Sequence, residues 1–218
     1  GLNPVKATPP CVNDADAVSG GSSSGAAASV AFNLAPCGIG SDTGGSVRIP
    51  SAWNDLVGLK TTHGRVSLGG VVPLCLTFDT IGPLCRSVED AGLMLAALEG
   101  AKPADLAQSD LTGRRFAVLK TIAMDDLRDA PAAAFAQAVE RIKAAGGTVE
   151  QIEIPDLHDA FNMAGPLYCA DAYGWWKDRV EAAPEKMFDQ ILERIRAGQG
   201  VLAADYVAHW IKLRDIRD

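Results

Sequence analysis

Two loops rich in glycine and serine carry the residues best suited to covalent chemistry. The first loop reads GGSSSG over residues 20–25, and the second reads GSDTGGS over residues 40–46. Each loop offers a serine hydroxyl, Ser22 in the first and Ser46 in the second. A hydroxyl is a weak nucleophile until a neighbouring group accepts its proton. Two such loops around one short segment therefore indicate acyl transfer with a serine as the attacking group.

The glycines just before Ser46 suit a second task in the same chemistry. A turn of glycines leaves backbone N–H groups free, and each such donor can stabilise the oxyanion of an acyl-transfer intermediate by roughly 3–4 kcal/mol. The backbone of Thr43, Gly44 and Gly45 is placed to supply these donors beside Ser46. Asp42 is interpreted as a turn former whose side chain binds the loop backbone, rather than as an acid catalyst.

The segment between the two loops is predicted to be a helix. Residues 26–35 are rich in alanine, the best helix former, and Pro36 stops the run. The first loop also fits G-x-S-x-G, the nucleophile elbow of α/β-hydrolases, with Ser23 attacking, but that elbow needs a preceding strand. Residues 13–17, NDADA, make a poor strand, which disfavours the elbow. The predicted helix and the second loop likewise disfavour a flexible Gly/Ser linker.

Beyond the loops the chain is predicted to alternate strands and helices. Residues 57–62 and 71–76 are predicted strands, and Ser87 caps a helix that Gly100 ends. In the second half, strands at 116–119 and 148–154 flank a helix at 131–145, which predicts a βαβ unit on a sheet.

After residue 155 the pattern is helical to the end of the chain. Two aromatic pairs, Trp175 with Trp176 and Tyr168 with Tyr173, are interpreted as packing residues rather than a substrate cage. The succession of elements indicates the α/β fold class.

Composition excludes several kinds of partner. The net charge is −7 and no block of lysine and arginine occurs, so nucleic acid and membrane surfaces are not expected partners. No apolar run approaches the roughly 18 residues that a membrane span needs. The five cysteines are scattered and form no C-x-x-C pair, so we expect no disulfide framework and no metal site, and a reducing cytoplasm.

The long combined motif closely resembles the amidase signature family. It reads GGSSSG, then GIGSDTGGSVRIPSAW, then VGLKTTHGRVS, then FDTIGPLCRSVEDA, and a looser likeness continues through ADYVAHWIKLRD. The resemblance implies a mixed, twisted β-sheet flanked by helices. It also implies that residues 1–218 are part of a single amidase domain, with a signature core at 19–100 and a βαβ-like and helical portion at 111–218.

The resemblance further implies roles for individual residues and no cofactor. Ser46 is the implied nucleophile, and Ser22, after a cis peptide bond, links it to a lysine. The implied distance between the two hydroxyl oxygens is roughly 2.5–3.0 Å. Backbone N–H groups of residues 43–46 form the implied oxyanion hole. Ser23 is a candidate for site support, and Arg48 for binding either a substrate carboxylate or a structural acid.

The family's general base is a buried, neutral lysine, because burial penalises its charged form. The family places that lysine well upstream of the GGSSSG loop, and neither Lys6 nor Lys60 matches its motif. We therefore expect this chain to be an internal piece of a longer enzyme, without the lysine-bearing and C-terminal segments. Alone, it is expected to be inactive, because base assistance contributes about 10²–10⁴-fold. We also expect it to form homo-oligomers or to associate with another chain through exposed apolar surface.

The predicted function of the full-length parent is hydrolysis of a small-molecule amide through a serine acyl-enzyme. A first alternative is the glutaminase component, known as the A subunit, of a tRNA-dependent amidotransferase. A second alternative is a folded, non-catalytic remnant or scaffold that has lost its base.

Overall fold

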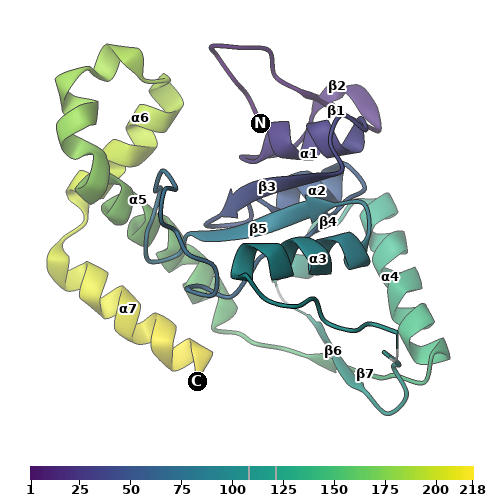
Figure 1. The fold of residues 1–218 in the computed structure, drawn as a ribbon. Helices are drawn as coiled ribbons and strands as arrows, with labels where there is room; N and C mark the ends of the chain where they lie inside the picture. Colours follow the sequence, from purple (N-terminus) through teal and green to yellow (C-terminus); the bar gives the residue numbers. More distant parts are fainter. Residues whose placement is uncertain (108, 121) are drawn as a thin grey trace. The chain divides into compact units, whose positions relative to one another are not determined.

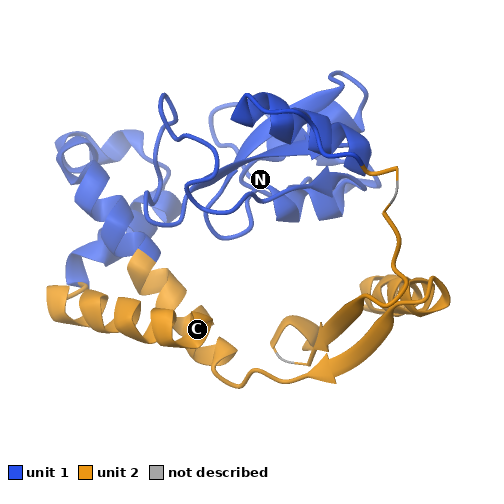
Figure 2. Ribbon diagram, turned by 60° about the horizontal axis from the view of Figure 1, so that its bottom comes forward, with its two compact units in different colours: residues 1–105, 168–200 blue, residues 106–167, 201–218 orange. Residues whose placement is uncertain are grey.

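The computed structural model describes residues 1–107, 109–120 and 122–218. The chain divides into two compact units, shown in different colours in Figure 2. Unit 1 comprises residues 1–105 and 168–200, and unit 2 comprises residues 106–167 and 201–218. Both serine loops belong to unit 1.

The centre of unit 1 is a three-stranded antiparallel sheet in the order β3-β5-β4. Its strands are β3 (Cys37–Asp42), β5 (Thr80–Cys85) and β4 (Val57–Gly58). Every residue of β5 is buried, because this strand lies between the other two and is covered on both faces. The register places Asp42, the last residue of β3, opposite Thr80, so the strand ends within the second serine loop.

Three helices cover this sheet. Helices α1 (Ser24–Ala31) and α2 (Arg48–Trp53) lie on one face, and α3 (Val88–Glu99) lies on the other (Figures 1 and 2). A small core of Ala27, Val47 and Leu84, all fully buried, joins α1, the start of α2 and β5. The small side chains of α1 allow the helix to approach β3 closely. A Cβ atom added to Gly38 would lie only 3.2 Å from the Cβ of Ala26.

Several predicted signals are confirmed. The Ser87 side chain accepts a hydrogen bond from the Asp90 N–H at 3.0 Å, so it caps α3 as its spacing indicates. Gly100 ends the same helix in the left-handed conformation at φ 64°. The helix between the serine loops is also present, although it ends at Ala31, before the predicted stop at Pro36.

The prediction that residues 13–17 form no strand is wrong. Asp14–Val18 forms β2, which pairs in antiparallel fashion with β1 (Pro10–Cys11). The first three residues of β2 are exposed, so water solvates the carboxylates of Asp14 and Asp16, and the strand forms without an apolar face at these positions. This pairing is a two-stranded ribbon rather than part of the central sheet.

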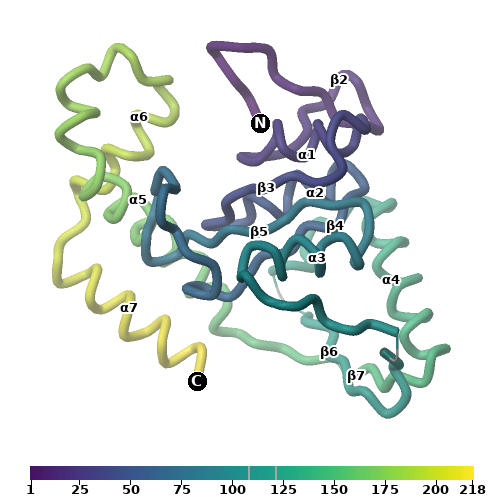
Figure 3. Tube along the Cα trace, viewed as in Figure 1, coloured from purple at the N-terminus to yellow at the C-terminus, as the bar shows by residue number. Residues whose placement is uncertain are grey.

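The prediction of a strand at residues 71–76 is also wrong. Figure 3 shows this segment as part of a long excursion between β4 and β5. The Asp79 carboxylate accepts hydrogen bonds from the backbone N–H groups of Leu74 and Cys75, which turns the chain back on itself. Of the predicted strand at 57–62, only Val57–Gly58 is a strand in the structure. Strands β3 and β5 were not predicted, because their glycines and proline are residues that usually mark turns.

Unit 2 contains the predicted βαβ arrangement. Strands β6 (Arg115–Leu119) and β7 (Thr148–Ile152) pair in parallel, and α4 (Asp129–Ala144) connects them. A short 3-10 turn, η1 (Ile122–Met124), precedes α4, and α7 (Ala203–Arg217) belongs to the same unit.

The long helix α5 (Leu157–Ala182) begins in unit 2 and ends in unit 1. In unit 1 its second half packs on α6 (Asp189–Arg196) through buried Ala172, Val180 and Ile195. The 3-10 turns η2 (Pro184–Lys186) and η3 (Ala197–Gly200) flank α6. Among the described residues, no helix combines the length and apolar character needed to cross a membrane.

The close approach of backbone to β5 gives a first prediction. A Cβ on Gly82 would stand 1.9 Å from the carbonyl oxygen of Leu59, and a backbone atom cannot swing aside as a side chain can. We expect Gly82→Ala to destabilise the protein by about 3 kcal/mol. The control is Gly92→Ala in α3, where nothing lies within 4 Å and the exchange should stabilise the helix by about 0.5–1 kcal/mol. Urea unfolding of both variants checks the pair, and equal midpoints would contradict the expectation.

Candidate active site

The two serine loops meet in space. The backbone N–H of Ser23 donates to the carbonyl oxygen of Ser46 at 3.1 Å, which ties the start of α1 to the turn between β3 and α2. The Gly21–Ser22 peptide bond is cis, as the family resemblance implies. Ser22 is exposed and Ser46 is half-buried, so the first loop lies open to solvent beside the second.

Asp42 organises the second loop from inside. Its fully buried carboxylate accepts hydrogen bonds from the backbone N–H groups of Gly45 at 2.7 Å, Val47 at 3.1 Å and Arg48 at 3.3 Å. The Arg48 guanidinium donates to the same carboxylate through Nε at 3.0 Å and Nη2 at 2.9 Å. Five donors on one carboxylate fix the turn that carries Ser46, so the interpretation of Asp42 as a turn former is confirmed.

The electrostatics of this pair favour the charged carboxylate. Burial raises the pKa of Asp42, but the hydrogen bonds from Arg48, Gly45 and Val47 and the Arg48 charge outweigh it, so the pKa lies below its ordinary value. Asp42 in turn raises the pKa of Arg48. Of the two roles open to Arg48, the structure shows the pairing with a structural acid, and the side chain remains half-exposed.

Gly45 adopts a conformation that other residues rarely take. Its φ is +126°, and a Cβ there would approach Ile49 Cδ1 to 2.7 Å. Its N–H is already engaged by Asp42. In contrast, the N–H groups of Thr43, Gly44 and Ser46 donate to no acceptor among the residues that the structure describes.

Thr43 connects the loop to a second buried acid that the sequence reasoning missed. The Thr43 hydroxyl donates to Asp79 Oδ1 at 2.5 Å, while Oδ2 of the same carboxylate accepts from the backbone N–H groups of Leu74 and Cys75. Asp79 is nearly fully buried. The sequence feature that could have indicated Asp79 is its position in the motif FDTIGPL, just before the first residue of β5.

Ser23 supports the site through its side chain as well as its backbone. Its hydroxyl donates to the Ser41 carbonyl at 3.3 Å, and a Cβ on Gly40 would stand only 2.5 Å from the Ser23 oxygen. The hydroxyl therefore binds strand β3 rather than being presented at the tip of an elbow. Lys60, the lysine of VGLKTT, donates to the Thr61 carbonyl at 2.7 Å.

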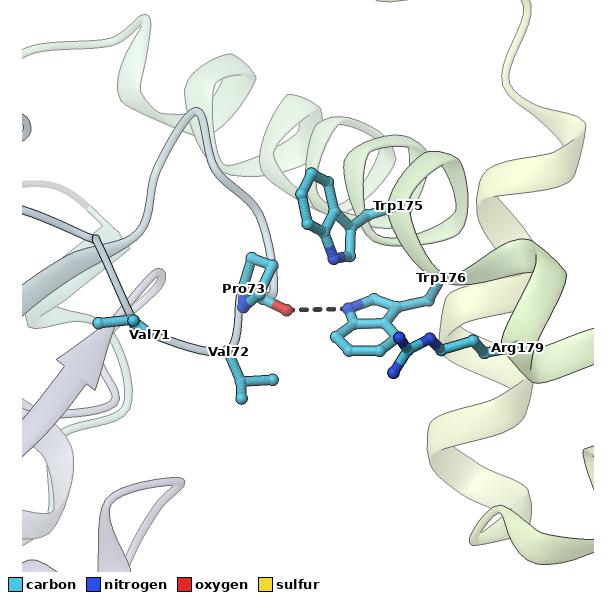
Figure 4. A pocket seen from close by; sticks show the side chains of 7 residues that line it. Val71, Val72, Pro73, Trp175, Trp176 and Arg179 are labelled. Carbon is cyan, nitrogen blue, oxygen red and sulfur yellow. Dashed lines mark hydrogen bonds between the residues drawn. The ribbon is translucent and has the colours of Figure 1, made fainter.

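An open pocket of about 400 Å³ lies between the 70–73 segment and α5 (Figure 4). The Trp176 indole N–H donates to the Pro73 carbonyl at 2.8 Å, and the Arg179 guanidinium carbon lies 5.6 Å from the centre of the indole. Trp176 thus anchors the segment to the helix, in line with the predicted packing role. Trp175 is 57% exposed and contributes a wall of the pocket instead.

Comparison with known proteins identifies the family. The family model Amidase matches residues 2–217, so the chain belongs to the amidase family. Among curated relatives, the A subunit of the glutamyl-tRNA(Gln) amidotransferase of Enterococcus faecalis is 32% identical over 94% of this chain and 48% of its own. That of Staphylococcus saprophyticus is 39% identical over 66% of this chain and 32% of its own.

Solved structures agree. A crystal structure of an amidase superposes with a TM-score of 0.86 at 29% identity, over 95% of this chain and 47% of its own. The A subunit of the glutamyl-tRNA(Gln) amidotransferase of Thermotoga maritima superposes with a TM-score of 0.73 at 28% identity, over 95% of this chain and 48% of its own. The resemblance and the predicted α/β fold, with sheets flanked by helices, are confirmed. The chain spans about half the length, or less, of the relatives that it matches.

Proposed function

We propose that the full-length protein hydrolyses a small-molecule amide through a covalent intermediate on Ser46. The Ser46 oxygen attacks the amide carbonyl carbon, the C–N bond breaks, and ammonia or an amine leaves with a proton. Water then attacks the acyl-enzyme ester and releases the carboxylic acid and the free serine. The observation that carries this proposal is the hydrogen bond from the Ser23 N–H to the Ser46 carbonyl, because it brings the two serine loops together.

We assign supporting roles from the geometry of the same loop. The N–H groups of Thr43, Gly44 and Ser46 would stabilise the oxyanion, since they have no other acceptor among the described residues, whereas Gly45 is committed to Asp42. Ser22 would pass the Ser46 proton to the lysine that the family resemblance places upstream of the first loop.

A second candidate function is the A subunit of a tRNA-dependent amidotransferase. The names of the Enterococcus and Staphylococcus relatives favour it. In that case glutamine is the amide and partner proteins bind the chain. The exposed Val72 and Trp175 would suit such association. The five cysteines are all free thiols, which fits a proposed cytoplasmic location.

An acyl-enzyme can be intercepted, which gives a test. Full-length protein incubated with simple aliphatic and aromatic amides should release ammonia, and added hydroxylamine should divert the acyl group to a hydroxamate. Turnover of the panel without partner proteins supports the hydrolase. Activity on glutamine alone, and only with partners present, supports the amidotransferase function. Release of ammonia with no hydroxamate at any hydroxylamine concentration would contradict the covalent serine mechanism.

A further inference from the structure

Helix α5 contacts the candidate oxyanion loop through the side chain of Tyr168. The Tyr168 hydroxyl donates to the carbonyl oxygen of Thr43 at 3.3 Å, across 125 residues of sequence. We propose that Tyr168 is a positioning residue that sets the direction of the Gly44 N–H toward the oxyanion. This inference rests on the proposed function of the loop, and it adds a residue outside both serine loops to the site.

The geometry of the peptide unit supplies the mechanism. The Thr43 carbonyl and the Gly44 N–H belong to one peptide unit, which is trans because the one cis bond among the described residues is Gly21–Ser22. In a planar trans peptide the C=O and N–H bonds point in opposite directions. A hydroxyl that binds the Thr43 oxygen therefore turns the Gly44 N–H away from Tyr168.

The missing side chain of Gly44 allows this contact. A Cβ on Gly44 would lie 3.1 Å from Tyr168 Cε2, which is tighter than ordinary van der Waals contact. The tyrosine ring thus lies against the peptide unit while its hydroxyl binds the carbonyl. Gly44 is otherwise exposed, and its φ is not in the left-handed region, so packing against Tyr168 explains glycine here better than backbone conformation does.

Tyr168 is itself held in place by the segment that precedes β5. Its ring packs edge-to-face on Phe78, with centroids 4.8 Å apart. One turn further along α5, the Asp171 carboxylate accepts from the Thr77 hydroxyl at 2.6 Å and from the Cys75 thiol at 3.2 Å. The Trp176 bond to the Pro73 carbonyl adds a third anchor.

These contacts close a circuit around Thr43. The Thr43 side chain is bound to Asp79, and its carbonyl is bound to Tyr168. Asp79 fixes the turn at Leu74 and Cys75, and α5 is anchored to the same segment. Thr43 is thus held at its hydroxyl by Asp79 and at its carbonyl oxygen by Tyr168, and both of these residues are anchored to the segment before β5. Such preorganisation favours the transition state, where the oxyanion forms, more than it favours bound substrate.

The test compares Tyr168→Phe with Tyr173→Phe in the full-length protein. Both substitutions delete one hydroxyl on α5, but Tyr173 packs against the cluster of Ala172, Val180 and Ile195, which does not include Thr43. For Tyr168→Phe we expect kcat to fall by about tenfold with KM within twofold, since one positioning hydrogen bond is lost and the ring remains. Tyr173→Phe should keep the wild-type kcat.

A second measurement separates positioning from a general loss of structure. Phenylboronic acid forms a tetrahedral adduct with an active serine, and its affinity for Tyr168→Phe should fall by the same factor as kcat. Wild-type kcat in Tyr168→Phe, or a rise in KM with unchanged kcat and boronate affinity, would overturn the inference. Failure of the proposed function looks different, because Ser46→Ala would then retain activity whatever Tyr168 does.

Discussion

Full-length Ser46→Ala protein should release ammonia from its best amide at least about 10³-fold more slowly than wild type. Without the hydroxyl no acyl-enzyme forms. Catalytic residues that act together lose nearly all of their combined rate acceleration when one of them is removed. The loop itself should survive, because the bond from the Ser23 N–H uses the Ser46 backbone carbonyl, which alanine retains. Loss of turnover should therefore come with little loss of stability.

Ser24→Ala is the matched control for this experiment. Ser24 lies in the first loop at the start of α1, and its hydroxyl makes no side-chain hydrogen bond among the described residues. Its kcat should stay within about twofold of wild type. Hydroxamate formation should vanish in Ser46→Ala and persist in Ser24→Ala. Equal ammonia release by wild type and Ser46→Ala would remove Ser46 from the mechanism, and an inactive full-length wild type would favour the non-catalytic scaffold.

Asp42→Ala should be among the most destabilising single substitutions in unit 1, costing about 4 kcal/mol. Removing the carboxylate leaves the N–H groups of Gly45 and Val47 without their acceptor, and it separates Arg48 from its ion pair. Asp178→Ala is the control, because Asp178 is exposed on α5 and should change stability by no more than about 0.5 kcal/mol. Urea unfolding at neutral pH measures both, and a shared midpoint would contradict the role assigned to Asp42.

The same carboxylate predicts a dependence of stability on pH. The pKa of Asp42 is lower in the folded protein than in the unfolded chain, so its ionisation stabilises the fold fully above about pH 4. That contribution is lost as the pH falls through the folded-state pKa. The difference in unfolding free energy between wild type and Asp42→Asn should therefore shrink from pH 5 to pH 3. A difference that stays constant over this range would show that Asp42 does not titrate in the expected direction.

The sequence alone was enough for the features whose signals are local or whose motif is long. The capping serine at Ser87 and the C-cap at Gly100 each depend on residues within one helical turn, so spacing revealed them. The same holds for the turn around Asp42, whose partners lie within six residues. The long combined motif pointed to the amidase family, to which the chain belongs.

The tertiary structure decided what local signals cannot encode. Residues 71–76 form a short apolar run of the kind typical of a strand, but the Asp79 carboxylate accepts hydrogen bonds from two of their backbone N–H groups and turns the chain instead. Strand β5 reads as irregular because burial on both faces removes the alternation that marks a half-exposed strand. The contact of Tyr168 with Thr43 joins residues 125 positions apart. A contact between such distant residues produces no periodicity in the sequence, because it forms only when folding brings the two segments together.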